Sequence, residues 1–186
     1  MTTSTAPAPA FTTSGAELPL VSLPQSELLT VNESTVPQVA NVIGDGIHLK
    51  PLRLDQERGE WVVLATFEPG TEVQLHYHTG TAEVYTLTGR WLYKEYEHEP
   101  QTAGSYLFEP GGSVHTFYVP AENTEDTVLF IRVEGANINF NEDGTFHSIL
   151  DATTIRHLTD TLSAEQGLGD LRYIGGGEAG FTDEDA

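Results

Sequence analysis

Short stretches rich in β-branched and aromatic residues recur along the middle of the chain, and Gly or Pro punctuates them. This is the pattern of short strands joined by tight turns. The expected strands cover residues 61–67, 73–78, 83–87, 91–96, 105–108, 116–119 and 127–133. Only residues 152–162 and the stretch after Ser163 show a weak helical pattern. Because no long amphipathic helix separates the strands, the pattern predicts an all-β antiparallel sandwich or barrel with few short helices.

The two ends of the chain have a different composition from the middle. Residues 1–24 are rich in Thr, Ser, Pro and Ala, which predicts a flexible arm. Residues 175–186 are glycine-rich and acidic, which predicts a disordered tail. Residues 25–174 remain for a single domain, and the 38% hydrophobic content is enough for one core.

Charge and cysteine content exclude several classes of protein. The chain has 8 Lys and Arg against 28 Asp and Glu, a formal net charge of -20, so nucleic acid and membrane surfaces are poor partners. With 0 Cys there can be no disulfide, thiolate nucleophile, zinc finger or iron–sulfur cluster. The first residues lack the basic and apolar regions of a signal peptide, and we therefore expect a cytoplasmic protein.

Three of the 7 histidines form a pattern that suggests metal binding. His76 and His78 lie two apart in an expected strand, so both imidazoles project from one face. His115 follows the turn at residues 110–114. The other four histidines are isolated and fit surface or packing roles.

The glycines and prolines around these histidines resemble the two-motif signature of the cupin superfamily, a small β-barrel of the jelly-roll type with metal in its mouth. The first block runs from Gly70 through His76 and His78 to Gly89, and the second runs from Gly104 to His115. The cupin pattern places a carboxylate four residues after the second histidine, where this chain has Ala82. Glu83 is one residue further on, and on a strand an offset of one residue turns a side chain to the opposite face. We therefore expect Glu83 to point away from the metal.

A closer resemblance is to the 2,4′-dihydroxyacetophenone dioxygenase family of cupins. It rests on His76-Tyr77-His78-Thr79-Gly80 and on residues 49–55, 85–95, 103–110, 115–116, 134–136 and 141–144. The resemblance implies that His76, His78 and His115 hold Fe(II). It also implies that O₂ is used to cleave the C–C bond between a ketone and its hydroxyl-bearing neighbour. Similar acetylacetone-cleaving cupins have a Glu six residues before the last ligand, and here that residue is Glu109.

This ligand set suits the chemistry, because three neutral imidazoles leave the metal its full positive charge and open positions for substrate oxygens and O₂. Glu109 is then a candidate base or orienting group, the alternative being a solvated turn residue before Pro110. Glu95 follows Trp91 and Tyr93 on one strand face. It is a candidate partner for a substrate hydroxyl if that face looks inward, and otherwise a rim residue beside two core aromatics. Tyr106 and Phe108 fit either the core or an aromatic platform.

The sequence thus predicts a non-heme Fe(II) dioxygenase that cleaves a small hydroxyketone, similar to 2,4′-dihydroxyacetophenone, or a β-diketone. Imidazole also binds Zn and Ni, and the alternative is a zinc-binding cupin sensor without catalytic activity. An isomerase or a metal-storage protein is a third, less favoured interpretation. The expected partners are a small-molecule substrate and O₂. A homodimer or higher oligomer is expected through the apolar segment at residues 18–21.

Overall fold

The structure is a computed structural model that describes residues 7–22 and 29–176. The chain divides into two compact units, Met1–Thr30 and Val31–Ala186. In the first unit, strands β1 (Ala8–Phe11) and β2 (Glu17–Ser22) form an antiparallel hairpin. Residues 1–6 and 23–24 of the expected arm, and residues 177–186 of the expected tail, lie outside the described residues.

The second unit is built from β-sheets, as the turn-punctuated pattern predicts. Its largest sheet has 6 strands in the order β15-β3-β4-β12-β6-β9. These strands are β3 (Ile47–Asp55), β4 (Glu60–Phe67), β6 (Ala82–Thr88), β9 (Tyr106–Glu109), β12 (Thr127–Glu134) and β15 (Ile174–Gly175). All pairings in this sheet are antiparallel except that of β15 with β3, which is parallel.

A second, 4-stranded sheet has the order β10-β5-β13-β14, and a 3-stranded sheet has the order β11-β7-β8. Their strands are β5 (His76–His78), β7 (Arg90–Tyr93), β8 (Gln101–Thr102), β10 (Val114–His115), β11 (Phe117–Tyr118), β13 (Asn137–Phe140) and β14 (Phe146–Leu150). Short 3-10 turns, η1 (Glu33–Thr35) and η2 (Lys94–Tyr96), lie in the connections.

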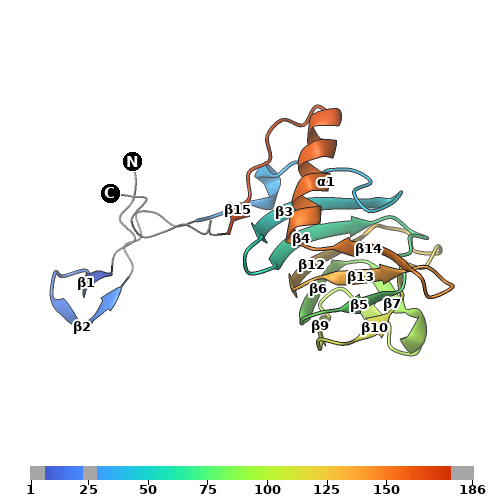
Figure 1. The fold of residues 1–186 in the computed structure, drawn as a ribbon, viewed down its shortest axis with the longest axis horizontal. Helices are drawn as coiled ribbons and strands as arrows, with labels where there is room; N and C mark the ends of the chain where they lie inside the picture. Colours follow the sequence, from blue (N-terminus) through green and yellow to red (C-terminus); the bar gives the residue numbers. More distant parts are fainter. Residues whose placement is uncertain (1–6, 23–28, 177–186) are drawn as a thin grey trace. The chain divides into compact units, whose positions relative to one another are not determined.

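The described residues contain one α-helix, α1 (Ala152–Glu165), which follows β14 and packs beside β3 and β14 (Figure 1). The Asp151 side chain caps its N-terminus by accepting a hydrogen bond of 2.7 Å from the Thr154 amide. Ile155 anchors it with no solvent exposure. The helix lies where the sequence shows only a weak helical pattern. Within the part of the chain that the structure describes, no helix is long and apolar enough to cross a membrane.

The core lies between the sheets and is filled mainly by apolar side chains of β3, β4, β6 and β12, together with Trp91 and Phe117. The tight turn between β6 and β7 depends on Gly89, whose φ is 78°. A Cβ at this position would lie 2.4 Å from the Thr127 hydroxyl oxygen, so only glycine fits.

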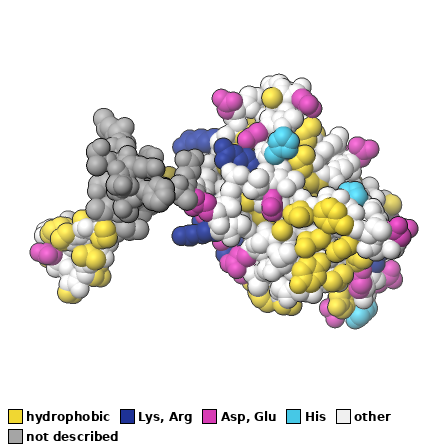
Figure 2. All heavy atoms as spheres, viewed as in Figure 1, with side chains coloured by type: hydrophobic (Ala, Val, Ile, Leu, Met, Phe, Trp, Pro, Cys, Tyr) yellow, Lys and Arg dark blue, Asp and Glu magenta, His cyan; other side chains and the backbone are white. Residues whose placement is uncertain are grey.

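The 4-stranded sheet has an unusual distribution of side chains. One row of paired residues, His115, His76, Asn139 and Ser148, crosses all its strands and faces inward. The adjacent row consists of Val114, Tyr77, Ile138 and Ile149, and three of these are among the exposed large hydrophobic residues. Figure 2 shows hydrophobic side chains gathered on the face over this sheet. In these two rows polar groups point inward and apolar groups outward, the reverse of the usual antiparallel pattern.

Candidate metal centre

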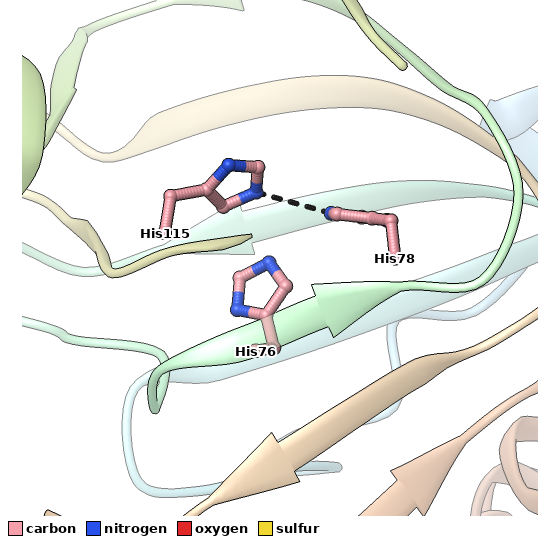
Figure 3. Close-up of side chains that lie close together, drawn as sticks. All are labelled: His76, His78 and His115. Atoms are coloured by element: carbon pink, nitrogen blue, oxygen red, sulfur yellow. Dashed lines mark hydrogen bonds between the residues drawn. The ribbon is translucent and has the colours of Figure 1, made fainter. Parts of the chain in front are cut away.

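Three histidine side chains converge inside the barrel. His76 and His78 come from β5, and His115 comes from β10, where it pairs in register with His76. All three are buried, with 5%, 2% and 3% exposure. One ring nitrogen of each lies within 4.8 Å of the others, and Figure 3 shows the three rings turned toward a common point. The structure thus brings together the three residues that the sequence singles out.

The donor atoms of this cluster fit a metal ion. The Nδ1 of His76 is 2.8 Å from the carbonyl oxygen of Gln74, and because a carbonyl only accepts, Nδ1 must carry the proton. The Nε2 lone pair of His76 is therefore free to bind a cation. The Nε2 atoms of His78 and His115 are 3.1 Å apart. Two nitrogens bound at a right angle to one ion about 2.1 Å away would be separated by about 3 Å.

Burial favours the neutral form of the His76 imidazole, which is the form that binds a cation. It lowers the pKa of His76 to about 4, so this imidazole is neutral at ordinary pH. A neutral imidazole is the form that binds metal. The Nδ1 of His78 has no hydrogen-bond partner among the described residues, so the ring orientation of His78 depends on what its Nε2 contacts.

Glu109 is the last residue of β9 and lies against the histidines with 5% exposure, so it is not a solvated turn residue. One carboxylate oxygen is 2.9 Å from the Nε2 of His78 and 3.4 Å from that of His115. Burial opposes ionisation of this carboxyl. Hydrogen bonds from His115 and His78 outweigh that effect and hold the pKa of Glu109 well below its usual range. The buried site therefore contains an ionised carboxylate.

Tyr93 links two members of the site. Its hydroxyl donates a hydrogen bond to the second carboxylate oxygen of Glu109. Its ring stacks on the His115 imidazole, with centroids 4.0 Å apart and an interplanar angle of 22°. Burial and the neighbouring carboxylate raise the pKa of Tyr93 well above its usual value, so the phenol stays protonated. The sequence suggests an inward face for Trp91 and Tyr93, but no spacing rule connects Tyr93 to Glu109.

Glu95 lies outside the cavity, which fits the rim position that the sequence leaves open as its alternative to the pocket. Strand β7 ends at Tyr93, and the chain turns into η2, which takes Glu95 off the inward face. Its two carboxylate oxygens accept hydrogen bonds from the amide and the hydroxyl of Thr116, both at 2.9 Å. Since Thr116 follows His115, Glu95 fixes the backbone that carries a histidine.

Glu83 faces away from the histidines, as its one-residue offset predicts. Its carboxylate is 3.2 Å from the Arg132 guanidinium and accepts a 2.8 Å hydrogen bond from the Tyr106 hydroxyl. Tyr106 and Phe108 are 60% and 53% exposed on that outer face. The expectation that they belong to the core or to a platform in the pocket is therefore wrong.

A cavity of about 70 Å³ opens beside His76, His78, Glu109 and Tyr93. Most of its walls are apolar side chains of β3, β4, β6, β12 and α1, and Trp91 also contributes. Such a site can place a small ligand against a metal and exclude bulk water.

Comparison with known proteins identifies the family. The sequence profile of the ChrR cupin-like domain matches residues 27–137. A protein of unknown function with a cupin-like fold from Ralstonia eutropha is 39% identical, with a TM-score of 0.81, and the match covers 85% of this chain and 98% of that one. An RmlC-like cupin protein from the same organism is 25% identical, with a TM-score of 0.71 and coverage of 79% and 92%.

An acetylacetone dioxygenase from Acinetobacter johnsonii shares the fold. It is 18% identical, with a TM-score of 0.60, and the match covers 74% of this chain and 93% of that one. No curated protein matches the sequence significantly. These similarities show a cupin barrel, whereas the narrower resemblance to 2,4′-dihydroxyacetophenone dioxygenases stays a prediction.

Proposed function

Because this chain belongs to the ChrR cupin-like domain family, we propose that it is a non-heme Fe(II) dioxygenase that cleaves a C–C bond of a small hydroxyketone or β-diketone. One observation carries the proposal: three buried imidazoles and the buried carboxylate of Glu109 converge at the end of an apolar cavity. The likeness to an acetylacetone dioxygenase supports the fold only, and the proposed chemistry rests on the residues of the site.

His76, His78 and His115 would hold the metal through neutral imidazoles. Bound Fe(II) would supply a positive charge for substrate oxygens and the redox chemistry with O₂. The protein contributes the surroundings: Gln74 fixes the ring of His76, Tyr93 packs on the ring of His115, and the apolar walls exclude water. In such surroundings a charge interacts more strongly with its neighbours than it would in water.

Glu109 would act as the base. A histidine nitrogen bound to metal no longer has a proton to donate, so its hydrogen bond to Glu109 is lost in the loaded protein. The carboxylate is then free to accept the acidic proton of the substrate. The Tyr93 hydroxyl keeps its contact with the other oxygen and orients the carboxylate.

The reaction is balanced without an external reductant. A 2-hydroxyketone of formula R–CO–CH₂OH and one O₂ contain the atoms of R–COOH and HCOOH. The bond between the carbonyl carbon and the hydroxyl-bearing carbon breaks, and each carbon gains one oxygen atom.

The test is O₂ uptake by protein loaded anaerobically with Fe(II), measured across a panel of hydroxyketones and diketones. The proposal expects uptake with at least one member of the panel and none with metal-free protein. The absence of uptake across the panel, with one iron bound per chain, would contradict it.

A second candidate function is a zinc-binding sensor. The observation that favours it is the position of Glu109, whose carboxylate oxygen is 2.9 Å from a histidine donor atom. A small movement would make it a fourth ligand, and closed four-ligand sites are typical of structural zinc. Metal analysis of anaerobically purified protein separates the two candidates, because the sensor would contain zinc and the dioxygenase iron.

A further inference from the structure

Besides the Nδ1 of His78, two polar groups in the wall of the cavity have no hydrogen-bond partner among the described residues. They are the indole nitrogen of Trp61 and the side-chain oxygen of Asn137. Trp61 is 4% exposed and Asn137 is 7% exposed, and both line the cavity that contains His76, His78 and Glu109. Buried polar groups are nearly always paired, so an unpaired donor and an unpaired acceptor in one cavity indicate a ligand.

The backbone places these two groups at the same end of the barrel. The Gly135 amide donates a 2.7 Å hydrogen bond to the Gly59 carbonyl, which ties the start of β13 to the start of β4. Asn137 follows Gly135 by two residues, and Trp61 follows Gly59 by two residues. Asn137 also pairs in register with His78, so its side chain lies next to a predicted metal ligand.

The hydrogen-bonding capacity of Trp61 and Asn137 indicates that the ligand carries a hydroxyl group. An indole N–H only donates, and an amide oxygen only accepts. A ligand carbonyl or carboxylate could satisfy Trp61 alone, and an ammonium could satisfy Asn137 alone. A hydroxyl satisfies both, because it accepts from Trp61 and donates to Asn137.

The cavity also limits the size of the ligand. Its volume of about 70 Å³ is roughly half that of a protein cavity that binds benzene, which is about 150 Å³. We propose that Trp61 and Asn137 determine specificity by binding a hydroxyl group of a small aliphatic hydroxyketone. This inference rests on the proposed function, since it places the other end of the same molecule at the histidines.

The test compares two probes that differ by one hydroxyl, 1,3-dihydroxypropan-2-one and 1-hydroxypropan-2-one. Their dissociation constants are measured without O₂ on Fe(II)-loaded protein by tryptophan fluorescence. We expect the dihydroxy ketone to bind at least about tenfold more tightly, as sites built to bond a hydroxyl reject the analogue that lacks it. In Asn137→Leu and Trp61→Phe the preference should fall to within about threefold. Trp91, which also lines the cavity, remains as the reporter in Trp61→Phe.

Asn139→Leu is the matched control, because it makes the same change two residues along β13 at a residue that does not line this cavity. It should keep the preference. Equal binding of the two probes to the unmodified protein would overturn the inference and mean that the pair holds an ordered water only. A preference that survives in both cavity variants would also overturn it. O₂ uptake on the same samples tests the proposed function separately, since the hydroxyl preference can be present without turnover.

Discussion

The two faces of the 4-stranded sheet differ in polarity in a way that packing of a hydrophobic core does not require. Its inward row holds His115, His76, Asn139 and Ser148, and its outward row holds Val114, Tyr77, Ile138 and Ile149. Placing polar side chains inside costs free energy unless they are paired. The difference indicates that the two histidines of the inward row are kept for binding, while the large sheet opposite supplies the apolar core.

The largest effect is expected from His115→Ala, on the inward face. Two imidazoles from one strand make an incomplete site, so bound iron should fall to below about a tenth of the unmodified level. Iron per chain, measured after anaerobic loading and desalting, checks this. His147→Ala is the control, because His147 is exposed on β14 of the same sheet. Equal iron in the two variants would show that the metal is held elsewhere.

Glu109→Gln should have the next largest effect. The amide keeps the size of the side chain but is not a base, so O₂ uptake should fall by at least about tenfold while iron is retained. Glu83→Gln, on the outer face of the neighbouring strand, should change neither quantity. Loss of iron in Glu109→Gln would make Glu109 a ligand, and unchanged uptake would remove it from the mechanism.

A smaller effect is expected from Glu95→Ala. It leaves the Thr116 amide and hydroxyl without their acceptor, which should lower the free energy of unfolding by about 1 kcal/mol. Iron and O₂ uptake should change little, since Glu95 lies outside the cavity. Chemical denaturation and O₂ uptake are measured on one preparation. A loss of uptake with unchanged stability would make Glu95 the catalytic residue that the sequence suggests.

Changes on the outward side should leave the metal centre intact. Tyr77 lies between two predicted ligands on β5, but its side chain points to the opposite face of the sheet. In Tyr77→Thr, bound iron and O₂ uptake should therefore stay within about twofold of the unmodified protein. A large loss of iron would mean that the two faces are not independent.

The N-terminal hairpin allows a prediction about assembly. Leu20 and Val21 on β2 are 54% and 67% exposed, and we propose that this hairpin contacts a second copy of the chain. Light scattering should show a dimer at micromolar concentration, and deletion of residues 1–24 should give a monomer with unchanged iron content. A monomer before the deletion would contradict this proposal.

The sequence predicts the barrel and the histidine cluster because both depend on local spacing. Gly and Pro mark the turns, and a period of two places His76 and His78 on one face. The same period predicts that Glu83 faces outward. The position of Glu95 could not be predicted, because β7 ends at Tyr93 and a short 3-10 turn follows. The contacts of Tyr93 with Glu109, and of Asn137 with the cavity, depend on pairings between strands distant in sequence, which a single sequence does not determine.

We propose that O₂ cleaves a C–C bond of the substrate and gives both its atoms to the products. The most direct test is mass spectrometry of the products formed by Fe(II)-loaded protein from a hydroxyketone that it turns over under ¹⁸O₂. We expect two carboxylic acids, each carrying one labelled oxygen, and one O₂ consumed per substrate. Unlabelled acids, or O₂ consumption with the carbon skeleton intact, would contradict it.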